Sequence, residues 1–214
     1  MTDALYIATT DRYSGKSLVS LGVTELLLRR TNRLGIFRPV IQAQPGEEPD
    51  KNIDLLLRHF DLHLEYEQTY GMTAREADEL MSQDRYTDIM DTIISRYKAL
   101  EGFCDFVLCI GSDLTSAATA LEFDFNADVA KNLGAPVLLV ASGVARDVPT
   151  IINSAHSTIN AYQALGAQVL GIVVNRVSMD DLEELRGALQ EELKDEDVVV
   201  AVVPAHGALA SPTI

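Results

Sequence analysis

Short apolar segments alternate with longer segments of helical periodicity along almost the whole sequence, and this alternation leaves few folds open. It is typical of a parallel sheet with helices on both faces. The apolar segments are rich in Val, Ile and Leu, as expected for strands that are buried on both faces. The predicted strands span Leu5–Ala8, Leu34–Val40, Asp105–Ile110, Pro136–Ala141, Val169–Val174 and Val198–Val203. We therefore predict an α/β fold with a mostly parallel sheet.

The segments between these strands predict helices. They span Lys16–Arg30, Lys51–Asp61, Thr73–Met81, Arg85–Glu101, Asn126–Leu133, Thr150–Leu165 and Asp180–Leu193. Thr73 and Glu76 have the spacing of a capping box, which supports a helix start at that point. The segment Gln42–Asp50 combines Pro and Gly with acidic residues and is predicted to be a loop. A chain of 214 residues suits one domain of above-average size.

The charge of the chain argues against two classes of partner. The formal net charge is −15 at pH 7, and binding to nucleic acid or to an anionic membrane requires clustered Lys and Arg. No apolar run approaches the roughly 18 residues of a membrane span, and the N-terminus lacks the basic segment of a signal peptide. We expect a cytoplasmic protein whose anionic ligands, if any, are held by local groups.

The first predicted strand is followed by a loop and then by Gly15-Lys16-Ser17 at the start of a helix, which is the context of a phosphate-binding loop. Backbone N–H groups and the helix N-terminus surround the phosphate in such a loop, Lys16 adds a positive charge, and Ser17 offers its hydroxyl to magnesium. The usual pattern, G-x-x-x-x-G-K-[ST], places a glycine where this chain has Thr10. A β-branched residue resists positive φ, so the loop either follows a different backbone path or is less open to phosphate. The alternative is a tight turn with an exposed lysine.

Five segments, spread in order along almost the whole chain, resemble the dethiobiotin-synthetase-like P-loop domain at the N-terminus of long-form bacterial phosphate acetyltransferases. They are SGKSLVSLGV at 14–23, GIFRPVIQ at 35–42, FDFNADVAKNLGAPVLLVASG at 123–143, GIVVNRV at 171–177 and VPAHGALASPT at 203–213. The segment at 123–143 is the most specific of them. The resemblance implies a single P-loop domain over residues 1–214.

The resemblance also implies roles for individual residues. The loop of dethiobiotin synthetase reads G-T-D-x-x-x-G-K-T, in which Thr9 of this chain replaces the first glycine. The matching residues are Thr10, Asp11, Gly15, Lys16 and Ser17. Asp54 matches a magnesium-coordinating aspartate, Asn175 an asparagine that contacts the nucleotide base, and Arg38 a lysine near the substrate. ATP and Mg²⁺ are therefore the expected ligands, with Ser17 and Asp54 on the metal.

One departure from the family pattern lies after the third predicted strand. The family has a metal-binding glutamate before the glycine, whereas this chain has Ile110 before Gly111. Ile110 has no oxygen ligand, and magnesium requires a nearly complete oxygen shell. Asp113 follows three residues later and is a candidate to reach inward. We therefore expect nucleotide hydrolysis to be impaired even if nucleotide binding is retained.

The resemblance leaves three functions open. In the complete family enzyme, acetyl-CoA and phosphate give acetyl phosphate and CoA, but the DRTGG and acetyl-transferring domains do not fit within 214 residues. The first hypothesis is a regulatory or assembly domain without activity of its own, with a nucleotide or metabolite effector and a homo-oligomeric or acetyltransferase partner. The second is an ATP-dependent ligase or ATPase of the dethiobiotin synthetase type. The third is a scaffold without a ligand.

Two other sets of residues have simpler interpretations. His59 and His63 are four residues apart on a predicted helix and could share a face, but we expect a solvated helix surface because no third metal ligand has a suitable spacing. Cys104 and Cys109 are expected to be small buried hydrophobic residues on opposite faces of a strand, not a metal or redox pair.

Overall fold

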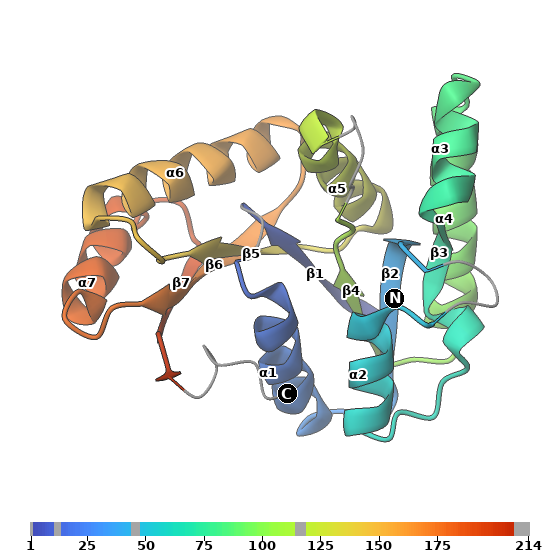
Figure 1. Cartoon of the computed structure of the whole chain (residues 1–214), viewed down its shortest axis with the longest axis horizontal. Coiled ribbons are helices and arrows are strands. Elements are labelled where there is room, and N and C mark those ends of the chain that lie inside the picture. The colour runs from blue at the N-terminus through green and yellow to red at the C-terminus, as the bar shows by residue number, and fades with distance from the viewer. Residues whose placement is uncertain (1, 11–13, 44–47, 114–118, 208–214) are drawn as a thin grey trace.

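The computed structural model describes residues 2–10, 14–43, 48–113 and 119–207. Strands and helices alternate in these residues (Figure 1). The strands are β1 (Asp3–Thr9), β2 (Leu34–Ile41), β3 (Tyr70–Thr73), β4 (Phe106–Ile110), β5 (Val137–Ser142), β6 (Val169–Val177) and β7 (Val199–Pro204). The helices are α1 (Lys16–Leu28), α2 (Lys51–His59), α3 (Ala74–Ser82), α4 (Tyr86–Glu101), α5 (Thr119–Leu133), α6 (Val148–Ala164) and α7 (Leu182–Glu192), with a 3₁₀ turn η1 at Tyr66–Gln68.

The described strands form one seven-stranded sheet in the order β3-β2-β4-β1-β5-β6-β7. Every neighbouring pair is parallel, so the predicted mostly parallel sheet is confirmed and extended to all of these strands. β1 lies between β4 and β5, with Ile7 opposite Ile110 on one side and opposite Leu138 on the other. The chain adds β2, β3 and β4 on one side of β1 and then crosses to the other side, where it adds β5, β6 and β7. The strand order therefore has a switch point at β1, and ligands of open α/β folds bind at such a point.

Helices cover both faces of the sheet (Figure 1). α1 and α2 pack on one face against a core cluster that includes Ile7, Ile36 and Ile110. Helices α3 to α7 contribute to a larger cluster on the other face, where Tyr6, Tyr97 and Val174 are buried. All eight residues of β2 are buried, which explains why its sequence reads as a continuous apolar run that contains one arginine.

All six predicted strands are present, and β3 is a further strand that was not predicted. This strand has only four residues, Tyr-Gly-Met-Thr, and lies at the edge of the sheet beside β2. A Cβ atom on Gly71 would lie 2.5 Å from the carbonyl oxygen of Pro39, so glycine allows the two backbones to approach closely. A short segment with an internal glycine gives no alternating pattern, and the strand forms because β2 offers it a partner.

The structure corrects three expectations about local structure. α5 begins at Thr119 and not at Asn126, and α2 ends at His59, so His63 lies outside the helix and does not share a helical face with it. Cys104 and Cys109 are buried free cysteines, as predicted, but both belong to the same core cluster. Cys104 precedes β4, so the alternation of a strand does not apply to it. No helix in the described part of the chain is long and apolar enough to cross a membrane.

Candidate functional site

The loop between β1 and α1 ends in a glycine that the geometry requires. Gly15 caps α1 with a φ of 88°, in the left-handed region, and its carbonyl oxygen accepts hydrogen bonds from the N–H groups of Leu18 and Val19. A Cβ atom at this position would lie 2.1 Å from Nδ2 of Asn175. Glycine is therefore needed both for the backbone conformation and for the close contact with β6. Thr10 follows β1, where its N–H donates to the carbonyl of Val140 at 3.0 Å, and Asp11 lies outside the described residues.

Asn175 supports this loop from the neighbouring part of the sheet. It lies in the carboxyl-terminal half of β6, its side chain is buried, and Nδ2 donates to the carbonyl oxygen of Ser14 at 3.0 Å. Asn175 Oδ1 and Ser14 Oγ are both buried without a hydrogen-bond partner among the described residues. Buried polar atoms are almost always hydrogen-bonded, to protein, water or a ligand. The structure therefore brings Asn175 to the loop, and its contact with a nucleotide base stays a prediction.

Lys16 is buried and paired with an acid, which differs from the exposed lysine of the tight-turn alternative. Its exposed fraction is 8%, and Nζ donates to Asp113 Oδ1 and to the carbonyl oxygen of Gly111, both at 2.6 Å. Burial lowers the pKa of Lys16, and the nearby carboxylate of Asp113 opposes part of that shift. The sequence made Asp113 a candidate to reach inward. Its side chain does point inward, and it contacts Lys16.

Arg38 joins the same group of charges from β2. Its side chain is 2% exposed, and Nη1 donates to both carboxylate oxygens of Asp50 at 3.0 Å. Nη2 donates to Asp113 Oδ2 at 2.7 Å, while Nε has no partner among the described residues. Asp50 also caps α2, because its Oδ1 accepts the N–H of Asn52 at 3.0 Å and that of Ile53 at 3.3 Å. One carboxylate therefore fixes both Arg38 and the start of α2.

Lys16, Arg38, Asp50 and Asp113 form what we call the charge cluster. It contains two cations and two anions, and Asp113 bridges the two cations. Burial raises the pKa of the Asp113 carboxyl, but Lys16 and Arg38 outweigh burial, so the pKa falls below its ordinary value and the group is ionised at neutral pH. The formal charges of these four side chains thus sum to zero.

The turn that carries Asp113 is held from three sides. Ser112 Oγ accepts the N–H of Val40 at 2.8 Å, and the side chain of Asn126 bonds both to the N–H and to the carbonyl oxygen of Ser112, at 3.0 and 3.1 Å. Asn126 Oδ1 in turn accepts the Tyr6 hydroxyl at 2.6 Å. These bonds link β1, β2 and α5 to the end of β4, and they fix the backbone beside Lys16.

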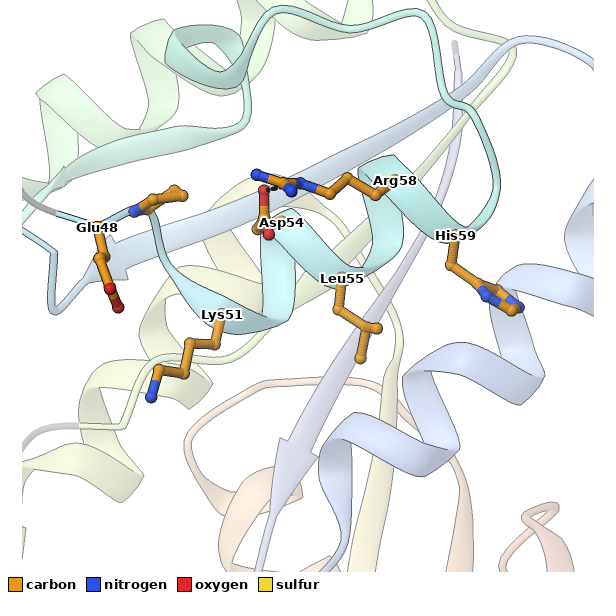
Figure 2. A pocket seen from close by; sticks show the side chains of 7 residues that line it. Glu48, Lys51, Asp54, Leu55, Arg58 and His59 are labelled. Atoms are coloured by element: carbon orange, nitrogen blue, oxygen red, sulfur yellow. Dashed lines mark hydrogen bonds and ion pairs between the residues drawn. The ribbon is translucent and has the colours of Figure 1, made fainter. Parts of the chain in front are cut away.

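Ser17 and Asp54, the two residues expected to bind a metal, form hydrogen bonds with other side chains of the protein. Ser17 Oγ donates to Asn52 Oδ1 at 2.5 Å, and Asp54 Oδ1 accepts from Arg58 Nε at 2.7 Å (Figure 2). Asp54 faces an open pocket of about 680 Å³ along α2, which Lys51 and His59 also line. Ile110 is buried in the core beside β1. Within the described residues, no group of three His, Cys, Asp or Glu side chains is placed to hold a metal ion.

The structure joins three residues that were not predicted for the site, Asp50, Asn52 and Asn126, to the predicted residues Ser17 and Arg38 and to the turn before Asp113. Asp50 lies directly before a helical segment, which is a common position for an N-cap and a usable sequence signal. Asn126 gave no such signal, because its role depends on the tertiary contact of α5 with the end of β4.

A parallel sheet whose first strand leads through a Gly-Lys-Ser loop into a helix defines a P-loop domain. A family model described as an AAA domain matches residues 3–213, and the chain belongs to this family. The fold is that of P-loop NTPases such as a variant of McdA from Cyanothece in complex with ATP, which superposes with a TM-score of 0.56 at 13% identity over 94% of this chain and 82% of that chain. A likeness at this identity shows the fold alone.

Two curated relatives are similar to this chain over most of its length. Phosphate acetyltransferase of Nitratidesulfovibrio vulgaris is 37% identical over 217 residues, which cover 100% of this chain and 31% of the relative. An ATP-dependent dethiobiotin synthetase of Bacillus subtilis is 22% identical over 176 residues, 81% of this chain and 74% of the relative. The chain is therefore homologous to the N-terminal part of phosphate acetyltransferases and spans less than a third of that acetyltransferase.

Proposed function

We propose that this chain is a regulatory or assembly domain of a phosphate acetyltransferase and that its loop binds the phosphates of a nucleotide such as ATP. The similarity to phosphate acetyltransferases over the whole chain supports the first part of the proposal. On this view, the conversion of acetyl-CoA and phosphate to acetyl phosphate and CoA is carried by other regions of the longer relatives. The expected partner is an acetyl-transferring domain, covalently linked or in a separate chain.

Phosphate binding is supported by the chemistry of the loop. A helix N-terminus offers backbone N–H groups and the positive end of its dipole to an anion, and α1 begins at Lys16 in this loop. Beside it, the buried Ser14 hydroxyl has no partner among the described residues and can donate to a phosphate, whereas the unpartnered acceptor Asn175 Oδ1 fits a donor such as the amino group of a base. Lys16 and Arg38 supply two cations within the same site. These residues would hold the phosphates of ATP, and the N-terminus of α1 would orient them.

Slow nucleotide cleavage is proposed from the groups around magnesium. The observation that carries this part is Ile110, an apolar residue buried at the carboxyl end of β4, where the related pattern has a metal-binding carboxylate. Ser17 would still offer an oxygen to Mg²⁺, but Asp54 is paired with Arg58. Phosphoryl transfer depends on positioning and on neutralisation of charge by the metal, so a weakly held metal leaves little rate acceleration.

Two assays of the purified chain test this proposal. We expect no formation of acetyl phosphate from acetyl-CoA and phosphate, and ADP release from Mg-ATP that does not differ between the wild type and Lys16→Ala. Magnesium-dependent ADP release that disappears in Lys16→Ala but persists in the exposed control Lys98→Ala would instead support an ATPase or ligase of the dethiobiotin synthetase type. Acetyl transfer by the chain alone at an ordinary enzymatic rate would contradict the regulatory role.

A further inference from the structure

We infer that Asp113 is an internal competitor of phosphate: its carboxylate takes the place on Lys16 and Arg38 that a phosphate ligand needs, and it must leave them when the ligand binds. The inference rests on the proposed function of the loop as a phosphate site. It adds a regulatory contact to that site, in which ligand binding and release of Asp113 are one exchange.

The charge balance of the cluster requires an exchange. Asp113 bonds to Lys16 at 2.6 Å and to Arg38 at 2.7 Å, and its single negative charge together with that of Asp50 balances the two cations. A phosphate that entered with Asp113 still in place would add at least one uncompensated negative charge to a largely buried group. An unpaired charge in such a site is strongly unfavourable. Departure of Asp113 leaves Lys16, Arg38 and Asp50 with one net positive charge for the ligand.

The two acids of the cluster differ in their freedom to leave. Asp50 bonds to Arg38 through both oxygens, caps α2 and has a side chain that is 6% exposed. The side chain of Asp113 is 48% exposed. Its carboxylate already reaches solvent, so it can exchange Lys16 and Arg38 for water without breaking the cap of α2 that holds Asp50. Asp113 is the anion that moves.

The exchange requires only rotation of the Asp113 side chain. The backbone before it is fixed by Ser112 and Asn126, and Gln42 Nε2 donates to the carbonyl oxygen of Asp113 at 2.6 Å. None of these bonds involves the carboxylate. The backbone of the turn can thus keep its position while the Asp113 carboxylate rotates between the two cations and solvent.

The competition also selects the class of ligand. A bound carboxylate with two ion pairs is displaced most readily by an anion that makes stronger charge-assisted hydrogen bonds to the same donors. A polyphosphate meets this requirement because it carries several charges and can reach the α1 N-terminus and both cations together. Inorganic pyrophosphate and ATP share this chemistry, and comparison of the two separates the contribution of the nucleoside.

The test is calorimetric titration of ATP and of inorganic pyrophosphate into the wild-type chain, Asp113→Asn and Asp105→Asn. Asp113→Asn keeps the size of the side chain and removes its charge. Asp105→Asn makes the same change in net charge at an exposed ion pair with Arg33, before the start of β4. We expect Asp113→Asn to bind roughly tenfold or more tightly than the wild type, because a like charge next to the ligand is removed. Asp105→Asn should bind like the wild type.

The possible outcomes separate the exchange from the function of the loop. Wild-type binding that is unchanged or weakened in Asp113→Asn would overturn the exchange while leaving the phosphate site in place. No binding to the wild type or to Asp113→Asn at millimolar ligand would contradict the proposed function, and the exchange with it. Thermal melting checks that each variant is folded, and Asp113→Ser replaces Asp113→Asn in the titration if the latter does not fold.

Discussion

At the scale of single residues, the charge cluster determines which charges lie beside the loop. A lysine that is 8% exposed is costly to keep charged, and Asp113 offsets part of that cost. Arg38 tolerates nearly complete burial because Asp50 and Asp113 accept its hydrogen bonds. The lysine of the loop is therefore held in place by Asp113, which the proposed phosphate ligand would replace.

The pKa of Lys16 gives a residue-scale prediction. Burial lowers this pKa from the ordinary lysine value of 10.5, while the Asp113 carboxylate raises it. We expect the Lys16 side chain to titrate below 10.5 and Asp113→Asn to lower the midpoint further, since the opposing charge is removed. The ¹³Cε resonance of Lys16, assigned with Lys16→Arg, reports the titration. A midpoint at or above 10.5, or one that rises in Asp113→Asn, would disagree with this description.

The residues of the site differ in how far the sequence could predict them. Gly15, Lys16 and Ser17 form a local pattern with a local purpose, and the structure places all three at the start of α1. Arg38 was predicted from resemblance, but its partners Asp50 and Asp113 lie 12 and 75 positions further along the chain. Pairing over such separations is set by the order of strands in the sheet, which no local pattern contains.

At the scale of elements, the junction of β1, α1 and β6 is the most restrictive part of the fold. Gly15 has a φ of 88° and packs against the amide of Asn175. Gly22 lies within α1, is exposed, and has no atom within 4 Å of the place where a Cβ would be. A side chain is therefore disfavoured at Gly15, which caps α1, and accommodated at Gly22, which lies inside it.

This contrast predicts opposite effects of one substitution. Gly15→Ala is expected to lower the free energy of unfolding by about 1–3 kcal/mol, because alanine disfavours this φ and its methyl group displaces Asn175. Gly22→Ala is expected to raise it by about 0.5–1 kcal/mol, because alanine is the better helix former. Chemical denaturation measures both. A stable Gly15→Ala variant would mean that the loop can adopt another conformation at the start of α1.

The elements themselves were largely predictable. The buried strands and the capping box at Thr73 appear in the sequence as local patterns, and the structure contains both. β3 was not predicted because its four residues carry a weak local preference. It forms where the neighbouring β2 provides a partner, which is a tertiary effect.

At the scale of the whole molecule, the site is a neutral cluster in a strongly acidic protein. The formal net charge of −15 repels an anionic ligand at long range. On the proposed function, binding of ATP arises from short-range contacts with the α1 N-terminus, Lys16 and Arg38. This makes a single buried lysine a sensitive test, since the net charge of the chain gives phosphate no general attraction.

The most direct measurement is calorimetric titration of ATP into the wild-type chain and Lys16→Ala, with and without magnesium, beside Lys98→Ala as an exposed lysine with the same change in charge. We predict binding in the wild type and in Lys98→Ala, and its loss in Lys16→Ala. Equal affinity in Lys16→Ala and the wild type, or no binding to the wild type at millimolar ATP, would contradict the assignment of the loop as a phosphate site.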